Sequence, residues 1–308
     1  MDDSQTLLNS PGPAQFAGPS EGSAARAWKA THATLLSFTL LGTLLTVLNF
    51  RWPVARNALV YAKISKDIVA HGFDLYAVVR DGAWTGGKPI LFPLLASPLT
   101  WLWNADAAVV ITSAICTVFF LYTASLVLTK LNSRVGFSEK SISLELTLVM
   151  LNPLVLYQFW SGYPDSLLAA FILLAFYLTE VVVTEPRRDT RWQIVVLGMT
   201  ILAAIHTKLY GAVLCVSCPL YIILHGKNFL VQSTFLKTKV AFLCGVFLAP
   251  FVLLALAKVG VYPLLDIGAN TGFNDYVVGL WESGFRDLQA ALAMMGFAIL
   301  LTFNFFLL

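Results

Sequence analysis

Long apolar runs, separated by short polar segments, recur along most of the chain. Runs long enough to cross a membrane lie at about 33–50, 107–128, 144–159, 166–183, 240–257 and 288–308. A transmembrane helix needs about 20 predominantly apolar residues to cross the hydrocarbon layer. The pattern predicts an all-α, polytopic transmembrane helical bundle.

A further apolar region, 193–224, is interrupted at its centre by the polar run 206–210. A single helix that carried Lys208 to the middle of the bilayer would cost about 2.5–3.5 kcal/mol on insertion. We therefore expect a hairpin of two short helices, 193–205 and 211–224, and about eight spans in total.

Basic residues support this number of spans. With the N-terminus in the cytoplasm, the short inner loops carry Lys130, Arg134, Lys140, Arg187, Arg188, Arg191, Lys227, Lys237 and Lys239. Cytoplasmic loops are enriched in lysine and arginine, and here the enrichment holds only if 193–224 crosses twice. The segment 1–31, rich in Ser, Ala, Gly and Pro, is expected to be a disordered cytoplasmic tail.

The first outer loop, 51–106, is too long to be a simple connection. After Pro53, a helix would have one apolar face, which contains Tyr61 and Ile64, and an opposite face of charged residues. This pattern predicts an amphipathic helix near 56–71 that lies in the plane of the membrane interface. The run 90–103 contains two prolines and is expected to form a re-entrant or interfacial piece.

The amino-acid composition indicates the solvent that surrounds the protein and the class of partner. Hydrophobic residues make up 58% of the chain and charged residues 12%, against about 45–50% and 25% in soluble domains. The bilayer is therefore expected to be the solvent, other membrane proteins are candidate partners, and the protein is expected in a bacterial inner (plasma) membrane. No basic run interleaved with aromatic residues occurs, so nucleic acid is not an expected partner.

Lys208 is the first candidate for chemistry. Two short helices would place it below the outer surface, where an ionisable group suggests a functional site. An ammonium group suits a phosphate, although the side chain could instead reach up to the interface. The candidate phosphate-binding residues are Lys208, His206, Tyr210, Arg56 and Lys88.

Carboxylates in the outer segments are the candidates for proton transfer. Asp165 ends a tight turn and could cap the next helix, line a polar cavity, or do both. Asp74 and Asp81 lie in the first outer loop, and the alternative to a chemical role is that they are solvated turn residues. In the last outer segment, Asp266, Asn270 and Asp275 lie among aromatic residues and suit sugar recognition, or equally an interfacial belt.

Several motifs together resemble a known family. They are His-Gly-Phe-Asp-Leu-Tyr at 71–76, Pro-Ile-Leu-Phe-Pro-Leu-Leu at 89–95, Asn-Pro at 152–153, Ser-Gly-Tyr-Pro-Asp at 161–165 and Gly-Met-Thr-Ile-Leu-Ala-Ala-Ile-His-Thr-Lys at 198–208. Over roughly 33–260 the chain resembles the GT-C superfamily of membrane glycosyltransferases, especially mannosyltransferases that use polyprenol-phosphate mannose. We therefore assign 32–308 to a GT-C-like transmembrane domain.

The resemblance implies transfer of a hexose, such as mannose, from a polyprenyl-phosphate donor on the extracytoplasmic face. It places Lys208 near the lipid phosphate and gives Asp165, Asp74 or Asp81 the role of base or metal ligand. A divalent metal is a possible cofactor, and the residues identify no particular ligand set.

The chain departs from the family in two places. The stretch 51–57 has no carboxylate where the family usually places an acidic residue, and the sequence stops within an apolar run at Leu308. These departures fit a shortened or non-catalytic membrane subunit that retains the fold. A transporter or permease subunit is a further alternative, because an intramembrane lysine and broken helices also mark substrate paths.

Overall fold

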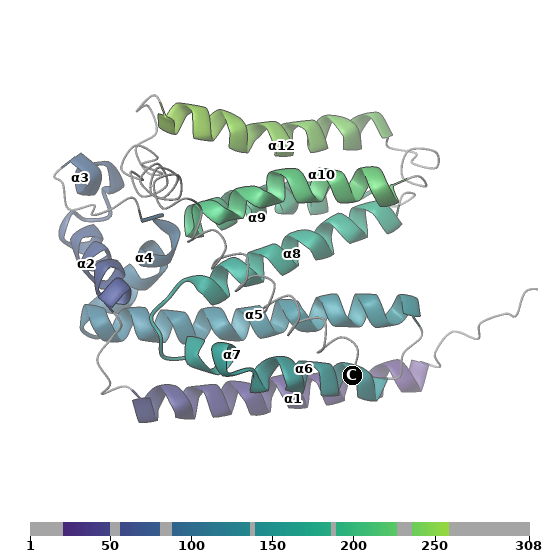
Figure 1. Cartoon of the computed structure of the whole chain (residues 1–308), viewed down its shortest axis with the longest axis horizontal. Coiled ribbons are helices and arrows are strands. Elements are labelled where there is room, and N and C mark those ends of the chain that lie inside the picture. Colours follow the sequence, from purple (N-terminus) through teal and green to yellow (C-terminus); the bar gives the residue numbers. More distant parts are fainter. Residues whose placement is uncertain are drawn as a thin grey trace, which may run out of the picture.

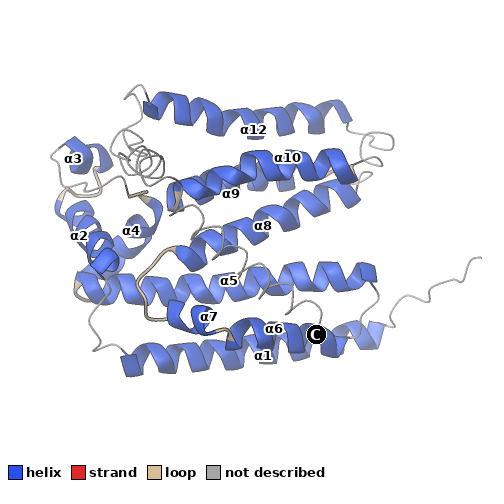
Figure 2. Cartoon of the chain, in the orientation of Figure 1, coloured by secondary structure: helices blue, strands red, loops and turns tan. Residues whose placement is uncertain are grey.

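A computed structural model describes residues 21–49, 56–80, 88–135, 139–185, 189–226 and 236–258. Within these residues the chain is helical, without a strand (Figure 2). The longer helices are α1 (Glu21–Asn49), α5 (Ala105–Val135), α6 (Glu139–Leu151), α8 (Asp165–Thr184), α9 (Arg191–Thr207), α10 (Leu214–His225) and α12 (Leu236–Lys258). They lie side by side, and α2 (Arg56–Ala70), α3 (Leu75–Arg80) and α4 (Leu91–Ala96) group at one end, here named the α2 end (Figure 1).

Three helices are long and apolar enough to cross a membrane. These are the segments Ala105–Leu131, Asp165–Thr184 and Leu236–Leu253. Shorter apolar helices cover His32–Leu48, Leu91–Trp101, Arg191–Thr207 and Tyr210–His225. The predicted all-helical class is therefore confirmed within the described residues, and three of these helices are long and apolar enough to span a membrane. The predicted total of eight spans is not confirmed, and the eighth predicted run, 288–308, lies outside the described residues.

Helix α1 corrects the predicted extent of the N-terminal tail. It begins at Glu21, inside the segment 1–31 that composition assigned to disorder. Alanine recurs between residues 21 and 33, and its high helix propensity favours this extension of the apolar helix. Residues 1–20 lie outside the described part of the chain.

Helix α2 confirms the predicted helix of the first loop but corrects its surroundings. Tyr61, Ile64, Ser65 and Ile68 on its apolar face are at most 3% exposed. They pack with α4, α5 and η1 (Ser97–Trp101), and the Tyr61 ring meets that of Phe92 edge-on at 5.4 Å. The stripe therefore packs mainly against protein.

The run 90–103 is divided into two short helices, α4 and η1, as predicted. Pro93 lies in the first turn of α4, and Pro98 lies at the start of η1, where the division occurs. The carbonyl oxygen of Pro93 accepts hydrogen bonds from the Ser65 hydroxyl at 3.0 Å and from the Ser97 hydroxyl at 2.7 Å. The same oxygen also accepts the backbone N–H of Ser97, so these hydroxyls supplement the helical hydrogen bond of Pro93. They also fasten α4 to α2.

The predicted interruption at Lys208 is present. Helix α9 ends at Thr207, Lys208 is extended with φ −155° and ψ 142°, and the chain then turns into η2 (Leu209–Val213). A Cβ atom on Gly211 would lie 2.4 Å from the carbonyl carbon of Ala204, so only glycine permits this close return. At 17 residues, α9 is about 26 Å long. It is longer than the predicted 193–205, which makes the recess at Lys208 shallower than expected.

Candidate functional site

Two chain reversals meet at the α2 end of the bundle. One is the turn between α7 (Pro153–Gln158) and α8, and the other joins α9 to η2. Helix α8 contacts both α5 and α9 over much of its length, so its first residue, Asp165, lies between them. Helix α9 ends at the same end of the bundle (Figure 1), and the reversal that follows it begins at Lys208.

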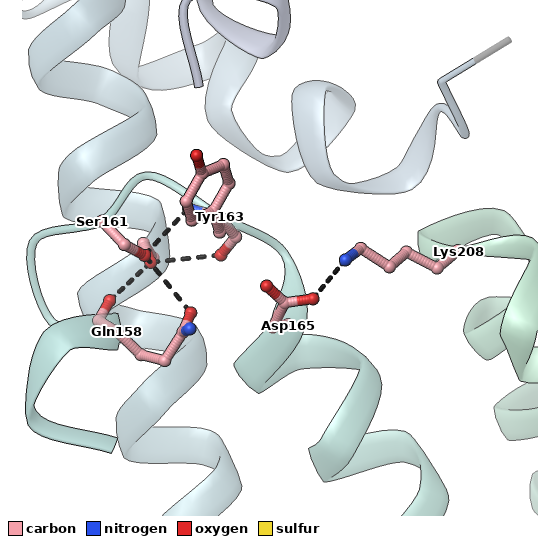
Figure 3. Close-up of polar contacts among 6 residues, drawn as sticks. Gln158, Ser161, Tyr163, Asp165 and Lys208 are labelled. Carbon is pink, nitrogen blue, oxygen red and sulfur yellow. Dashed lines mark hydrogen bonds and ion pairs between the residues drawn. The ribbon is translucent and has the colours of Figure 1, made fainter. Parts of the chain in front are cut away.

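Asp165 and Lys208 form an ion pair. The ammonium Nζ of Lys208 donates to Oδ1 of Asp165, and Figure 3 shows the lysine side chain extended from its own segment toward the start of α8. The side chains are 27% exposed for Lys208 and 46% exposed for Asp165. Both charges are therefore accessible to a ligand that approaches this end of the bundle.

Two tyrosines lie in the electrostatic field of Asp165. Burial is the main reason that the pKa of Tyr61 is raised, and the negative charge of Asp165 raises it further. Burial also raises the pKa of Tyr163, followed by the effects of Tyr157 and Asp165. Both phenols are therefore neutral at physiological pH. The carboxylate sits in a region with neutral hydroxyl groups and one cation.

The turn that leads to Asp165 is held by hydrogen bonds. The Ser161 hydroxyl lies 3.2 Å from Oε1 of Gln158, to which it donates, and it accepts from the Tyr163 amide at 3.1 Å (Figure 3). Ser113 of α5 lies 2.6 Å from the carbonyl oxygen of Gln158 and 3.2 Å from that of Tyr163. Gly162 between them has φ +69°, a conformation that glycine adopts without strain. The position of Asp165 is thus fixed from α5 as well as from α8.

The other predicted phosphate-binding residues contribute less to this site. The His206 Nδ1 atom is 2.7 Å from the carbonyl oxygen of Leu202 in its own helix, and Tyr210 is 79% exposed on η2. No ion pair among the described residues joins Lys88 to Asp165. The side chain of Arg56 lies outside the described part of the chain.

The other predicted carboxylates divide into two groups. Asp74 is exposed, and its Oδ1 accepts hydrogen bonds from the amides of Tyr76 and Ala77, each at 3.0 Å. This is the geometry of a helix cap at the start of α3. The remaining predicted residues, which lie outside the described part of the chain, are Asp81, Asp266, Asn270 and Asp275.

Sequence reasoning missed Ser113 and the place of Tyr61 beside Asp165. A serine within a long apolar run carries no signal that distinguishes a turn-holding role from solvent exposure or back-bonding to its own helix. Among the described residues, no three His, Cys, Asp or Glu side chains come close enough together to hold a metal ion. In this part of the chain, the candidate site is therefore an ion pair with aromatic hydroxyls.

Comparisons with protein-family models, with curated proteins and with solved structures found no match to this chain. The function is therefore argued from the geometry of the site.

Proposed function

We propose that this protein is an integral membrane glycosyltransferase that transfers a hexose from a polyprenyl-phosphate donor. The observation that carries the proposal is the partly exposed ion pair between Asp165 and Lys208, at an end of an apolar helical bundle where two reversals meet. The proposal includes eight spans, a cytoplasmic N-terminus and a site on the extracytoplasmic face of a bacterial plasma membrane.

The two charges suit the two halves of the transfer. The acceptor hydroxyl loses its proton to the carboxylate of Asp165 as its oxygen forms a bond to the anomeric carbon of the sugar. The bond from that carbon to the phosphate oxygen breaks, and polyprenyl phosphate leaves with an additional negative charge. Lys208 stabilises this developing charge, which is how a positioned cation lowers such a barrier, and Asp165 acts as general base.

The ion pair also suggests an order of events. Without donor, Lys208 neutralises Asp165. When the donor phosphate binds, it competes for the same ammonium group and weakens the hold on the carboxylate. The carboxylate oxygen released in this way is free to accept the hydrogen bond of the acceptor hydroxyl. Donor binding would thus prepare the base for the acceptor.

Purified full-length protein in proteoliposomes tests the proposal directly. Radiolabelled polyprenyl-phosphate mannose, glucose and galactose are supplied in turn, each with a set of alkyl glycoside acceptors. We expect release of polyprenyl phosphate and a labelled glycoside with at least one donor. A nucleotide-sugar donor should give neither product, since it has no polyprenyl chain to bind in the bilayer.

A specific observation favours one second candidate, a non-catalytic membrane subunit. Asp74 is engaged as a helix cap, and the stretch 51–57 lacks a carboxylate, so few acidic groups of the first loop remain for chemistry. Failure to consume any lipid-linked donor, by protein shown to be folded, would overturn the enzyme proposal in favour of this one.

A further inference from the structure

A second polar feature lies on the exposed side of α2. A groove of about 550 Å³ opens between α2, η1 and the start of α5. Its lining includes Lys63 and Lys66 from α2, and Trp103, Asn104 and Asp106 from the start of α5 and the residues before it. Pockets of about 300–1,000 Å³ are the size that holds small ligands.

The charge of the groove favours an anion. Lys63 and Lys66 are three residues apart and so lie on the same face of α2. Both are exposed, and the structure records no ion pair to either among the described residues. Asp106 is the one acidic residue in the lining, so the side chains of the groove carry a net charge of +1 from two lysines and one aspartate.

The groove lies beside a surface typical of the membrane interface. Trp101 and Leu102 are each 69% exposed and Trp103 is 48% exposed. The apolar segment of α5 that is long enough to span begins two residues later, at Ala105. Tryptophan is enriched at the level of the lipid headgroups. The two lysines are thus placed where a spanning helix enters the hydrocarbon layer.

We infer that this groove binds the phosphate of an anionic phospholipid headgroup. Lys63 and Lys66 pair with the phosphate, and Trp103 packs against the glycerol and the first acyl carbons. Free inorganic phosphate offers the same charge without the apolar part, so it is the weaker ligand for a groove with an exposed tryptophan. The groove lining contains neither Asp165 nor Lys208, and the inference does not depend on the proposed enzymatic activity.

The test measures lipid binding by the full-length protein in a neutral detergent. Delipidated protein is titrated with phosphatidylglycerol, and bound lipid is counted by native mass spectrometry. Phosphatidylcholine, whose phosphate charge is balanced by its own ammonium group, is the comparison without net charge. A basic residue near an anionic lipid surface contributes about fivefold in affinity. We expect about a fivefold loss for Lys63→Gln or Lys66→Gln, and retention of binding when either lysine is replaced by arginine.

Two further variants make the result specific. Asp106→Asn removes the opposing charge and should strengthen binding by about fivefold, which a general loss of folding cannot imitate. Lys237→Gln removes an exposed lysine of α12 outside the groove and should change nothing. Equal binding of both lipids, wild-type affinity in the Lys63→Gln/Lys66→Gln double variant, or displacement of the lipid by an equimolar amount of inorganic phosphate would each overturn the inference.

Discussion

Helix α8 carries a lysine–carboxylate pair at each of its ends. At its start, Asp165 pairs with Lys208, and just after its last residue Glu185 pairs with Lys130 of α5 at 3.4 Å. The exposures are similar: 27% for Lys208 and 46% for Asp165, against 26% for Lys130 and 31% for Glu185. Both pairs join segments that are more than forty residues apart in sequence.

The surroundings of the two pairs differ. Near Glu185 lie further charged groups, including the pair of Asp189 with Arg191 at 2.6 Å and the buried Lys239 of α12. Around Asp165 the neighbours are the neutral phenols of Tyr61 and Tyr163, and the backbone there leaves the helical conformation at Lys208. A pair within a wider set of charges is already compensated, whereas the Asp165 pair can exchange one partner for a ligand. On this difference rests our proposal that the first pair carries out chemistry and the second stabilises the fold.

The largest expected effect comes from removing each carboxylate's charge in turn. Asp165→Asn should lower the rate of sugar transfer by ~10²–10⁴-fold, the usual consequence of losing a general base. Glu185→Gln should leave the rate unchanged. Both should cost only about 1 kcal/mol or less in unfolding free energy, since both pairs are partly exposed. Equal rates in the two variants would remove the distinction between the ends of α8.

The lysines give the next largest contrast. Lys208→Met should reduce kcat by ~10²–10³-fold, as does loss of one group that stabilises transition-state charge, and should raise the KM for the donor. Lys130→Met should alter neither value. Lys208→Arg keeps the charge and should recover part of the activity. If Lys208→Met changes neither kcat nor KM, the lysine neutralises Asp165 and does nothing further.

Sequence could predict the components of the site but not their pairing. Lys208 was identified because it interrupts an apolar run, and Asp165 because it ends a polar turn before another run. Each was given a separate role. Nothing in a spacing of 43 residues indicates that the two charges touch, because the contact depends on how α8 packs against α9.

The sequence could not predict what α2 packs against, for a related reason. An apolar stripe has the same period whether it faces lipid or protein, so the helix was predicted well while its environment was not. The break of the run 90–103 follows from Pro98 at the start of η1, because proline removes a backbone donor whatever its surroundings, whereas Pro93 is accommodated in the first turn of α4. Local backbone rules were thus more predictive here than patterns of burial.

The unfolding free energies of two glycine variants test whether the reversal that positions Lys208 is as rigid as its geometry indicates. Gly211→Ala would place a Cβ atom 2.4 Å from the backbone of Ala204, so the two segments must move apart, at a cost of about 1–3 kcal/mol. Gly245→Ala in α12 is the matched control, because no atom beyond its chain neighbours and the adjacent backbone of its own helix lies within 4 Å of the added Cβ, and it should be neutral or slightly stabilising. Chemical unfolding of the purified variants measures both. Similar stability of the two would show that the reversal is easily deformed.

The smallest effect concerns the tyrosine that distinguishes the surroundings of Asp165. Tyr61 is 3% exposed, and burial followed by the charge of Asp165 raises its pKa above the usual value near 10. The folded protein therefore keeps this proton at a pH where the unfolded chain releases it. The resulting stability is complete below about pH 10 and is lost as the pH rises further, by about 1 kcal/mol between pH 10 and 11. Tyr61→Phe should remove that loss, whereas Tyr210→Phe, which changes a tyrosine that is 79% exposed, should retain it. Unfolding free energies measured at pH 8, 10 and 11 give the comparison, and parallel curves for wild type and Tyr61→Phe would show that the folded protein does not raise the pKa of Tyr61.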